Sequence, residues 1–168
     1  MQHRDFVIKW VLYALISLIF VLVQVFALVH IRFWGIHPFV FPALVATVAA
    51  LEPAHESAVY ALVCGAVLDL TMPGVIPCFY TVAFIVVFLV TKLLAVKVLS
   101  MPFICCMLCG ALGILCTGLL NALFLSVSAE FTLQTVLLTA GKELLLTLPL
   151  LPLIYLPAWK VRRIFHQE

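Results

Sequence analysis

Apolar segments long enough to cross a lipid bilayer follow one another along almost the whole chain of 168 residues. Hydrophobic residues make up 67 % of the sequence and charged residues 10 %, whereas soluble domains contain roughly 45–50 % and about 25 %. A water-soluble fold of this size could not hide so much apolar surface. Because a transmembrane helix needs about 20 apolar residues, the sequence predicts an all-α integral membrane protein.

Prolines, glycines and charged residues divide the chain into six predicted transmembrane helices. Pro38 and Pro42 stand at the start of a short second helix, since proline suits the first turn. The turn at 71–74 contains Pro followed by Gly and separates the third helix from the fourth. Pro149 and two later prolines predict kinking or unwinding of the inner half of the last helix. We expect helices at 6–29, 36–51, 57–72, 76–91, 103–127 and 131–159, in a single polytopic domain 1–168 without a soluble part.

The nine Lys and Arg residues predict the orientation of these helices. Basic residues that flank short spans stay on the cytoplasmic side. With both termini inside, seven of the nine fall on the inner side, Arg32 falls on an outer loop and Lys142 lies within the last helix. The seven are Arg4, Lys9, Lys92, Lys97, Lys160, Arg162 and Arg163. We therefore expect an N-in/C-in topology, and the small net charge of +2 implies no nucleic-acid partner.

Sequence signatures of catalysis are absent. The chain has no Gly-x-Ser-x-Gly, no His-Glu-x-x-His and no Gly-rich phosphate loop, which are motifs with known chemistry. Cys106-Met107-Leu108-Cys109 has C-x-x-C spacing, so it can be a redox or metal pair. Buried cysteine usually packs as a small hydrophobe, which is the preferred interpretation. We predict that the chain is not an enzyme and binds no cofactor or metal.

Small residues at four-residue spacing mark two faces for close helix packing in lipid. Ala61, Gly65 and Asp69 share one face of the third helix, and Cys106 and Gly110 share one face of the fifth. Such a face can contact another helix of the same chain or a second chain. Internal packing is the preferred interpretation, and a homodimer is the alternative.

Polar side chains within the spans are costly in hydrocarbon and are usually functional or paired. Asp69 lies near the outer end of the third helix, and Lys142 and Glu143 lie in the sixth. Gln24 and Asn121 can donate interhelical hydrogen bonds, each contributing about 0.6–2 kcal/mol. If the third and sixth helices touch, Lys142 and Asp69 converge, because side chains lean toward their helix N-terminus. This polar set indicates either a transport site or, preferably, a satisfied structural network.

The segment Gly65-Ala66-Val67-Leu68-Asp69-Leu70, followed by the Pro73-Gly74 turn, resembles the most distinctive segment of the bacterial rod shape-determining MreD family. The surroundings agree with that resemblance. Gln24 sits near the outer end of the first helix, a proline-led second helix follows, and the chain closes on a short basic tail at 159–163. The pattern covers nearly the whole chain.

The resemblance implies a non-enzymatic scaffold of the elongasome, the rod complex of the bacterial cytoplasmic (inner) membrane. MreD-like proteins work with an MreC-like protein and indirectly with the MreB filament, RodA and a class B penicillin-binding protein. This machinery places lateral peptidoglycan synthesis and sets cell shape. The candidate structural or interaction residues are Gly65, Asp69, Pro73, Gly74, Gln24, Asn121, Lys142 and Glu143.

The resemblance also implies a bundle similar to the six-helix S components of vitamin uptake systems. A substrate-binding S component of an energy-coupling-factor transporter is therefore the alternative function. An S component should have a roomy outward pocket with convergent polar groups. It should also carry Ala-x-x-x-Ala spacing on its first helix for the coupling partner. Ala14, Ser17 and Ala27 do not provide that face.

The predicted topology can be tested with a reporter. A topology reporter fused after Glu168 should be active on the cytoplasmic side, because the basic residues flanking the spans stay inside. Reporters fused in the outer loops should show the opposite activity. Activity of the terminal fusion only outside the cytoplasm would contradict either the number of helices or their orientation.

Overall fold

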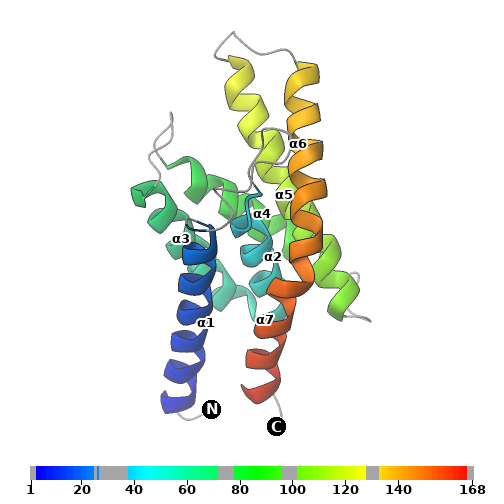
Figure 1. Ribbon diagram of the computed structural model, residues 1–168. Helices are drawn as coiled ribbons and strands as arrows, with labels where there is room; N and C mark the ends of the chain where they lie inside the picture. Colours follow the sequence, from blue (N-terminus) through cyan, green and yellow to red (C-terminus); the bar gives the residue numbers. More distant parts are fainter. Residues whose placement is uncertain are drawn as a thin grey trace.

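The structure, a computed structural model, describes residues 3–24, 26, 38–71, 78–95, 102–127 and 133–165. The helices are α1 (His3–Val23), α2 (Phe41–Leu51), α3 (Ala54–Thr71), α4 (Phe79–Ala95), α5 (Pro102–Val127), α6 (Leu133–Thr147) and α7 (Leu151–Phe165), with a 3-10 turn, η2 (Leu148–Leu150), between the last two. These residues include no strand, so the predicted all-helical class is confirmed for them (Figure 1). Pro73 and Gly74 lie outside the described residues.

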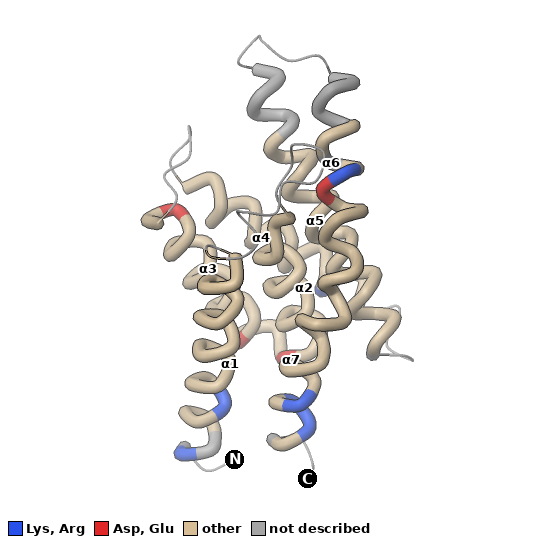
Figure 2. Tube along the Cα trace, in the orientation of Figure 1, with Lys and Arg blue, Asp and Glu red and all other residues tan. Residues whose placement is uncertain are grey.

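Three helical segments are long and apolar enough to cross a membrane: Phe6–Val23, Phe103–Asn121 and Gly141–Ile164. Large apolar side chains also remain exposed on the outside of the bundle, such as Leu70 at 84 % and Leu93 at 72 %. Both termini lie at one end, and Lys and Arg residues of α1 and α7 gather there (Figure 2). The described residues form a helical bundle of membrane character.

The last predicted helix bends at the first of its three prolines. α6 ends at Thr147, the turn Leu148–Leu150 contains Pro149, and α7 continues from Leu151. Proline has no N–H for the helix ladder, and its ring clashes with the carbonyl of the preceding turn. The predicted interruption is therefore found at Pro149, whereas α7 continues as a helix through Pro157.

α2 lies at the centre of the bundle, in contact with α3, α4, α5 and α7 (Figure 1). Ten of its eleven residues are buried, as expected for a helix that is apolar all round. At 1.5 Å per residue it extends about 16 Å, roughly half of a hydrocarbon core about 30 Å thick. The residues at both of its ends are buried inside the protein, Val40 at 2 % and Glu52 at 3 % exposure.

α2 begins at Phe41, later than the predicted start at 36. The buried side chain of Gln24 explains how the non-helical residues 38–40 are accommodated. Its Nε2 donates to the Pro38 carbonyl oxygen at 2.7 Å, and its Oε1 accepts from the Val40 N–H at 3.3 Å. Irregular backbone at membrane depth is stable only where such groups find partners within the protein. Gln24 thus supports the start of the central helix.

The predicted small-residue faces pack against other helices of the same chain. A methyl group placed on Gly65 would lie 2.5 Å from the Thr81 Cα atom of α4 and 3.0 Å from its backbone nitrogen. On α5, a methyl group on Gly110 would collide with the Leu151 side chain, and one on Gly113 would lie 3.0 Å from the Pro42 carbonyl oxygen. Internal packing is therefore confirmed for these glycines.

We predict that Gly65→Ala destabilises the protein. The added methyl group meets α4 backbone, which cannot move cheaply, and such overpacking typically costs about 1–3 kcal/mol. Gly141→Ala is the matched control, because nothing lies within 4 Å of its added methyl group, and alanine in a helix is favoured by roughly 0.5–1 kcal/mol. Thermal unfolding in detergent should separate the two variants. Equal melting temperatures would contradict the close contact.

Candidate functional site

The turn between α2 and α3 buries two carboxylates. The Glu52 side chain is 0 % exposed and that of Glu56 is 11 % exposed. Glu52 caps the C-terminal end of α2, where its N–H donates to the Val48 carbonyl oxygen at 2.9 Å. Glu56 lies in the first turn of α3, where the helix dipole favours a negative charge. Both carboxylates need partners, because an isolated buried charge is very costly.

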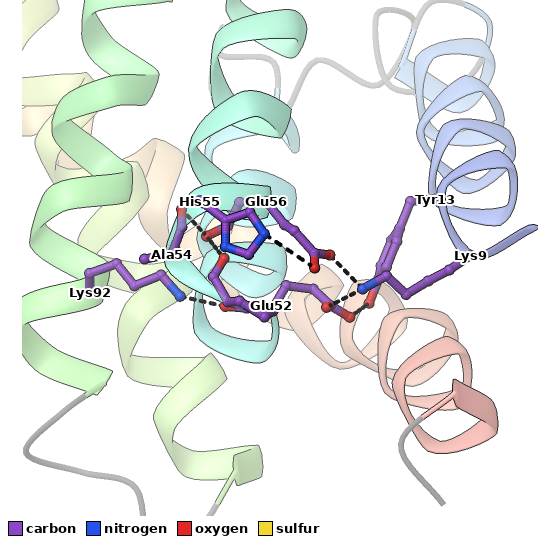
Figure 3. A network of polar contacts seen from close by, with 9 residues as sticks. Lys9, Tyr13, Glu52, Ala54, His55, Glu56 and Lys92 are labelled. Carbon is purple, nitrogen blue, oxygen red and sulfur yellow. Dashed lines mark hydrogen bonds and ion pairs between the residues drawn. The ribbon is translucent and has the colours of Figure 1, made fainter. Parts of the chain in front are cut away.

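Lys9 of α1 supplies the positive charge for both carboxylates (Figure 3). Its Nζ lies 2.8 Å from Glu52 Oε2 and 2.5 Å from Glu56 Oε2, and the Lys9 side chain is only 1 % exposed. The ammonium group also lies 5.7 Å from the centre of the Trp10 ring. A long aliphatic stem lets lysine reach across a helix interface while its head group stays paired.

Two further side chains complete the network. The Tyr13 hydroxyl, one turn along α1 from Lys9, donates to Glu52 Oε1 at 2.8 Å. Lys92 of α4 donates to the backbone carbonyl oxygen of Glu52 at 2.5 Å. A cation suits this position, because carbonyl groups at a helix C-terminal end lack partners within the helix. The network therefore connects α1, the α2–α3 turn and α4 at one residue, Glu52 (Figure 3).

Sequence reasoning missed this network. It used Lys9 and Lys92 only to assign the topology and gave Glu52 and Glu56 no role. A signal was present, because Glu52 and Glu56 are four residues apart, as are Lys9 and Tyr13. The predicted topology also puts both pairs at the inner side. The sequence does not show which helices lie side by side, and this information was missing.

The carboxylate of Asp69 serves a second polar site, at the opposite end of α3. Its Oδ1 accepts from the Tyr80 N–H at 2.9 Å, and its Oδ2 accepts from the Thr81 N–H at 3.0 Å and the Thr81 hydroxyl at 2.6 Å. Tyr80 and Thr81 belong to the first turn of α4, whose N–H groups have no partners within the helix. Asp69 therefore caps α4 from a neighbouring helix and places a negative charge at its positive end.

Gly65 and Asp69 act on the same turn of α4. The missing side chain at Gly65 lets the Thr81 backbone approach α3, and this approach brings the Thr81 N–H within reach of Asp69 one turn further along. Cys78, just before α4, has a positive φ of 62° and its thiol is only a weak acceptor. The aspartate therefore provides a cap that the residue preceding α4 does not.

The other predicted polar residues stand apart from these two sites. Asn121 is exposed on α5, and Lys142 and Glu143 are half-buried on α6, where they form the adjacent blue and red segments of Figure 2. Among the described residues no ion pair joins Lys142 to Asp69. The partners of Asp69 are instead donors of α4.

The cysteines of α5 pack in the core. Cys105, Cys106 and Cys109 are buried with free thiols, and the Cys109 sulfur lies 3.9 Å from that of Cys105. Within the described ranges, no cluster of three or more His, Cys, Asp or Glu side chains is arranged to hold a metal ion.

Comparison of the chain with protein-family models, with curated proteins and with solved structures finds no match.

We predict that Lys9→Met strongly destabilises the protein. It leaves two buried carboxylates without their cation, and breaking one partner of a buried pair costs about 3–5 kcal/mol. Adding Glu52→Gln should recover part of the loss, because one uncompensated charge is removed. Arg4→Met changes an exposed cation of the same helix and should have little effect. Thermal unfolding of the wild type, Lys9→Met, the Lys9→Met/Glu52→Gln double variant and Arg4→Met tests this prediction. A Lys9→Met protein as stable as Arg4→Met would rule out the network.

Substitutions at Asp69 should be graded by the acceptors that they remove. Asp69→Asn keeps one acceptor oxygen and should be intermediate, whereas Asp69→Leu removes every acceptor and should lose about 0.5–2 kcal/mol, as for other helix caps. Thr81→Val removes one hydrogen bond and should have the smallest effect. Neutralising Lys142 should not rescue Asp69→Asn. Rescue, measured by thermal stability and abundance, would restore the ion-pair interpretation.

Proposed function

We propose that this protein is a non-enzymatic membrane scaffold of the bacterial rod complex. In this role it binds an MreC-like protein and helps to position lateral peptidoglycan synthesis. The main support is the pairing of Gly65 with Asp69, the residues at the centre of the resemblance to the MreD family. In the structure they serve one purpose together, because both act on the first turn of α4.

The use of the buried charges also supports a scaffold. Lys9 pairs with both Glu52 and Glu56, and Asp69 binds the end of a helix. Charges used in this way fix the relative positions of α1, α2, α3 and α4. Such a bundle can present constant surfaces to partner proteins, whereas a catalytic site would keep a nucleophile or a base available for substrate.

The proposal includes a six-span topology in the bacterial cytoplasmic membrane with both termini inside. The three helical segments with the length of a span support membrane insertion. The shared end of both termini and the basic residues gathered there support the orientation (Figure 2). The short helix α2 fits this topology, because protein rather than lipid surrounds its ends. The MreB filament, RodA and a class B penicillin-binding protein would be indirect partners.

Co-purification in mild detergent tests the proposed function. The full chain should retain a co-expressed MreC-like protein, and it should not retain the ATPases and transmembrane coupling subunit of an energy-coupling-factor transporter. In rod-shaped cells that depend on the chain, its depletion should give rounded cells. Retention of the transporter subunits with no retention of the MreC-like protein would favour the S-component alternative.

A further inference from the structure

A cavity of about 710 Å³ lies between α1 and α3. It follows α1 from Phe6 to Val21 and α3 from His55 to Thr71. At 1.5 Å per residue each wall is about 23 Å long, which is most of a hydrocarbon core about 30 Å thick. The length of the cavity therefore suits a transmembrane helix, whereas one lipid chain occupies only about half of a hydrocarbon core.

Each wall presents one helical face to the cavity. On α1 the lining positions include Trp10, Ala14 and Leu18, and on α3 they include Val59, Val63 and Val67. Residues four apart lie above one another on a helix. Two parallel ridges of this kind form the groove into which a third helix packs, and a small side chain such as that of Ala14 lets its backbone come close.

Two polar contacts hold the walls in place. Ser17 of α1 donates to the Tyr13 carbonyl oxygen at 2.7 Å, so the Tyr60 hydroxyl of α3 donates to the Ser17 oxygen at 2.6 Å. Nearer the N-terminal end of α1, Lys9 forms an ion pair with Glu56 of α3. These contacts fix the spacing between α1 and α3, so the groove is preformed.

Among the residues that line the cavity, Glu56 is the one acidic residue, and it lies at the end of the cavity next to Lys9. Glu56 Oε2 binds Lys9, while Oε1 lies 3.7 Å from the ring of His55, whose side chain is 81 % exposed. A carboxylate has about four acceptor positions, so Oε1 can accept a further donor. The cytoplasmic flank of a transmembrane helix is enriched in Lys and Arg, and this charge complements Glu56.

We propose that this cavity is the docking groove for the single transmembrane helix of a partner protein. The helix lies between α1 and α3, with a Lys or Arg of its cytoplasmic flank against Glu56. The inference rests on the proposed function, in which the partner is the MreC-like protein. It adds the location, the depth and the charge pairing of the contact.

Photo-crosslinking in membranes locates the partner helix. A photo-reactive amino acid at Val63 should cross-link to the transmembrane segment of the co-expressed MreC-like protein. The same amino acid at Leu89 of α4 should not. The two positions are matched, because Val63 is 56 % exposed and Leu89 is 53 % exposed, and only Val63 lines the cavity. Mass spectrometry identifies the cross-linked product.

A second pair of variants tests the groove by filling it. Ala14→Trp should weaken binding of the MreC-like protein by about fivefold or more, because overpacking of a contact costs about 1–3 kcal/mol. Ala66→Trp, on an exposed α3 position outside the cavity, should bind normally. Both variants should melt at the wild-type temperature. Replacing the basic flank of the partner helix by Gln should also weaken binding.

The outcomes separate the two proposals. If the wild-type chain does not retain the MreC-like protein, the proposed function fails and the groove proposal fails with it. If the protein is retained, but Val63 and Leu89 cross-link equally or Ala14→Trp binds like Ala66→Trp, only the groove proposal is overturned. A Val63 product that contains a lipid or a second copy of this chain would also overturn it.

Discussion

The short central helix α2 imposes the constraint on which the rest of the structure depends. Its eleven residues reach only about half of a hydrocarbon core, and the residues at both of its ends are buried within the protein, Val40 at 2 % and Glu52 at 3 % exposure. Buried backbone groups need partners within the protein. Gln24 supplies them at the start of the helix, and Lys92 supplies one at its end. The neighbouring helices therefore stabilise both ends of α2.

Because buried polar groups need partners within the protein, polar residues link one helix to another. Lys9 is buried because Glu52 and Glu56 neutralise it, and α4 begins where it does because Asp69 accepts its first N–H groups. Gly65 contributes to the same contact, because its missing side chain lets the α4 backbone approach α3, where Asp69 binds it. A bundle held in this way has a defined groove between α1 and α3, and a preformed groove suits a binding partner better than a flexible surface does.

Particular residues show how far sequence reasoning reached. The helical class followed from hydrophobicity, the bend at Pro149 followed from the missing N–H of proline, and the packing role of Gly65 followed from its spacing. The convergence of Lys142 and Asp69 required contact between two helices, and the structure gives Asp69 donors of α4 instead. The network at Glu52 was missed, because Lys9 is 43 residues from Glu52 and 47 residues from Glu56, and only the fold brings them together.

The sequence by itself determined that the chain is a helical bundle of membrane character and that its last helix is interrupted at Pro149. These properties depend on local composition, on proline geometry and on the transfer of side chains from water, all of which act within one segment. Only the tertiary structure decided that α2 is central, that Lys9 meets two glutamates, and that Asp69 caps a neighbouring helix. These pairings depend on which helices lie side by side. In a medium that offers no hydrogen bonds, each buried polar group must find its partner on another segment.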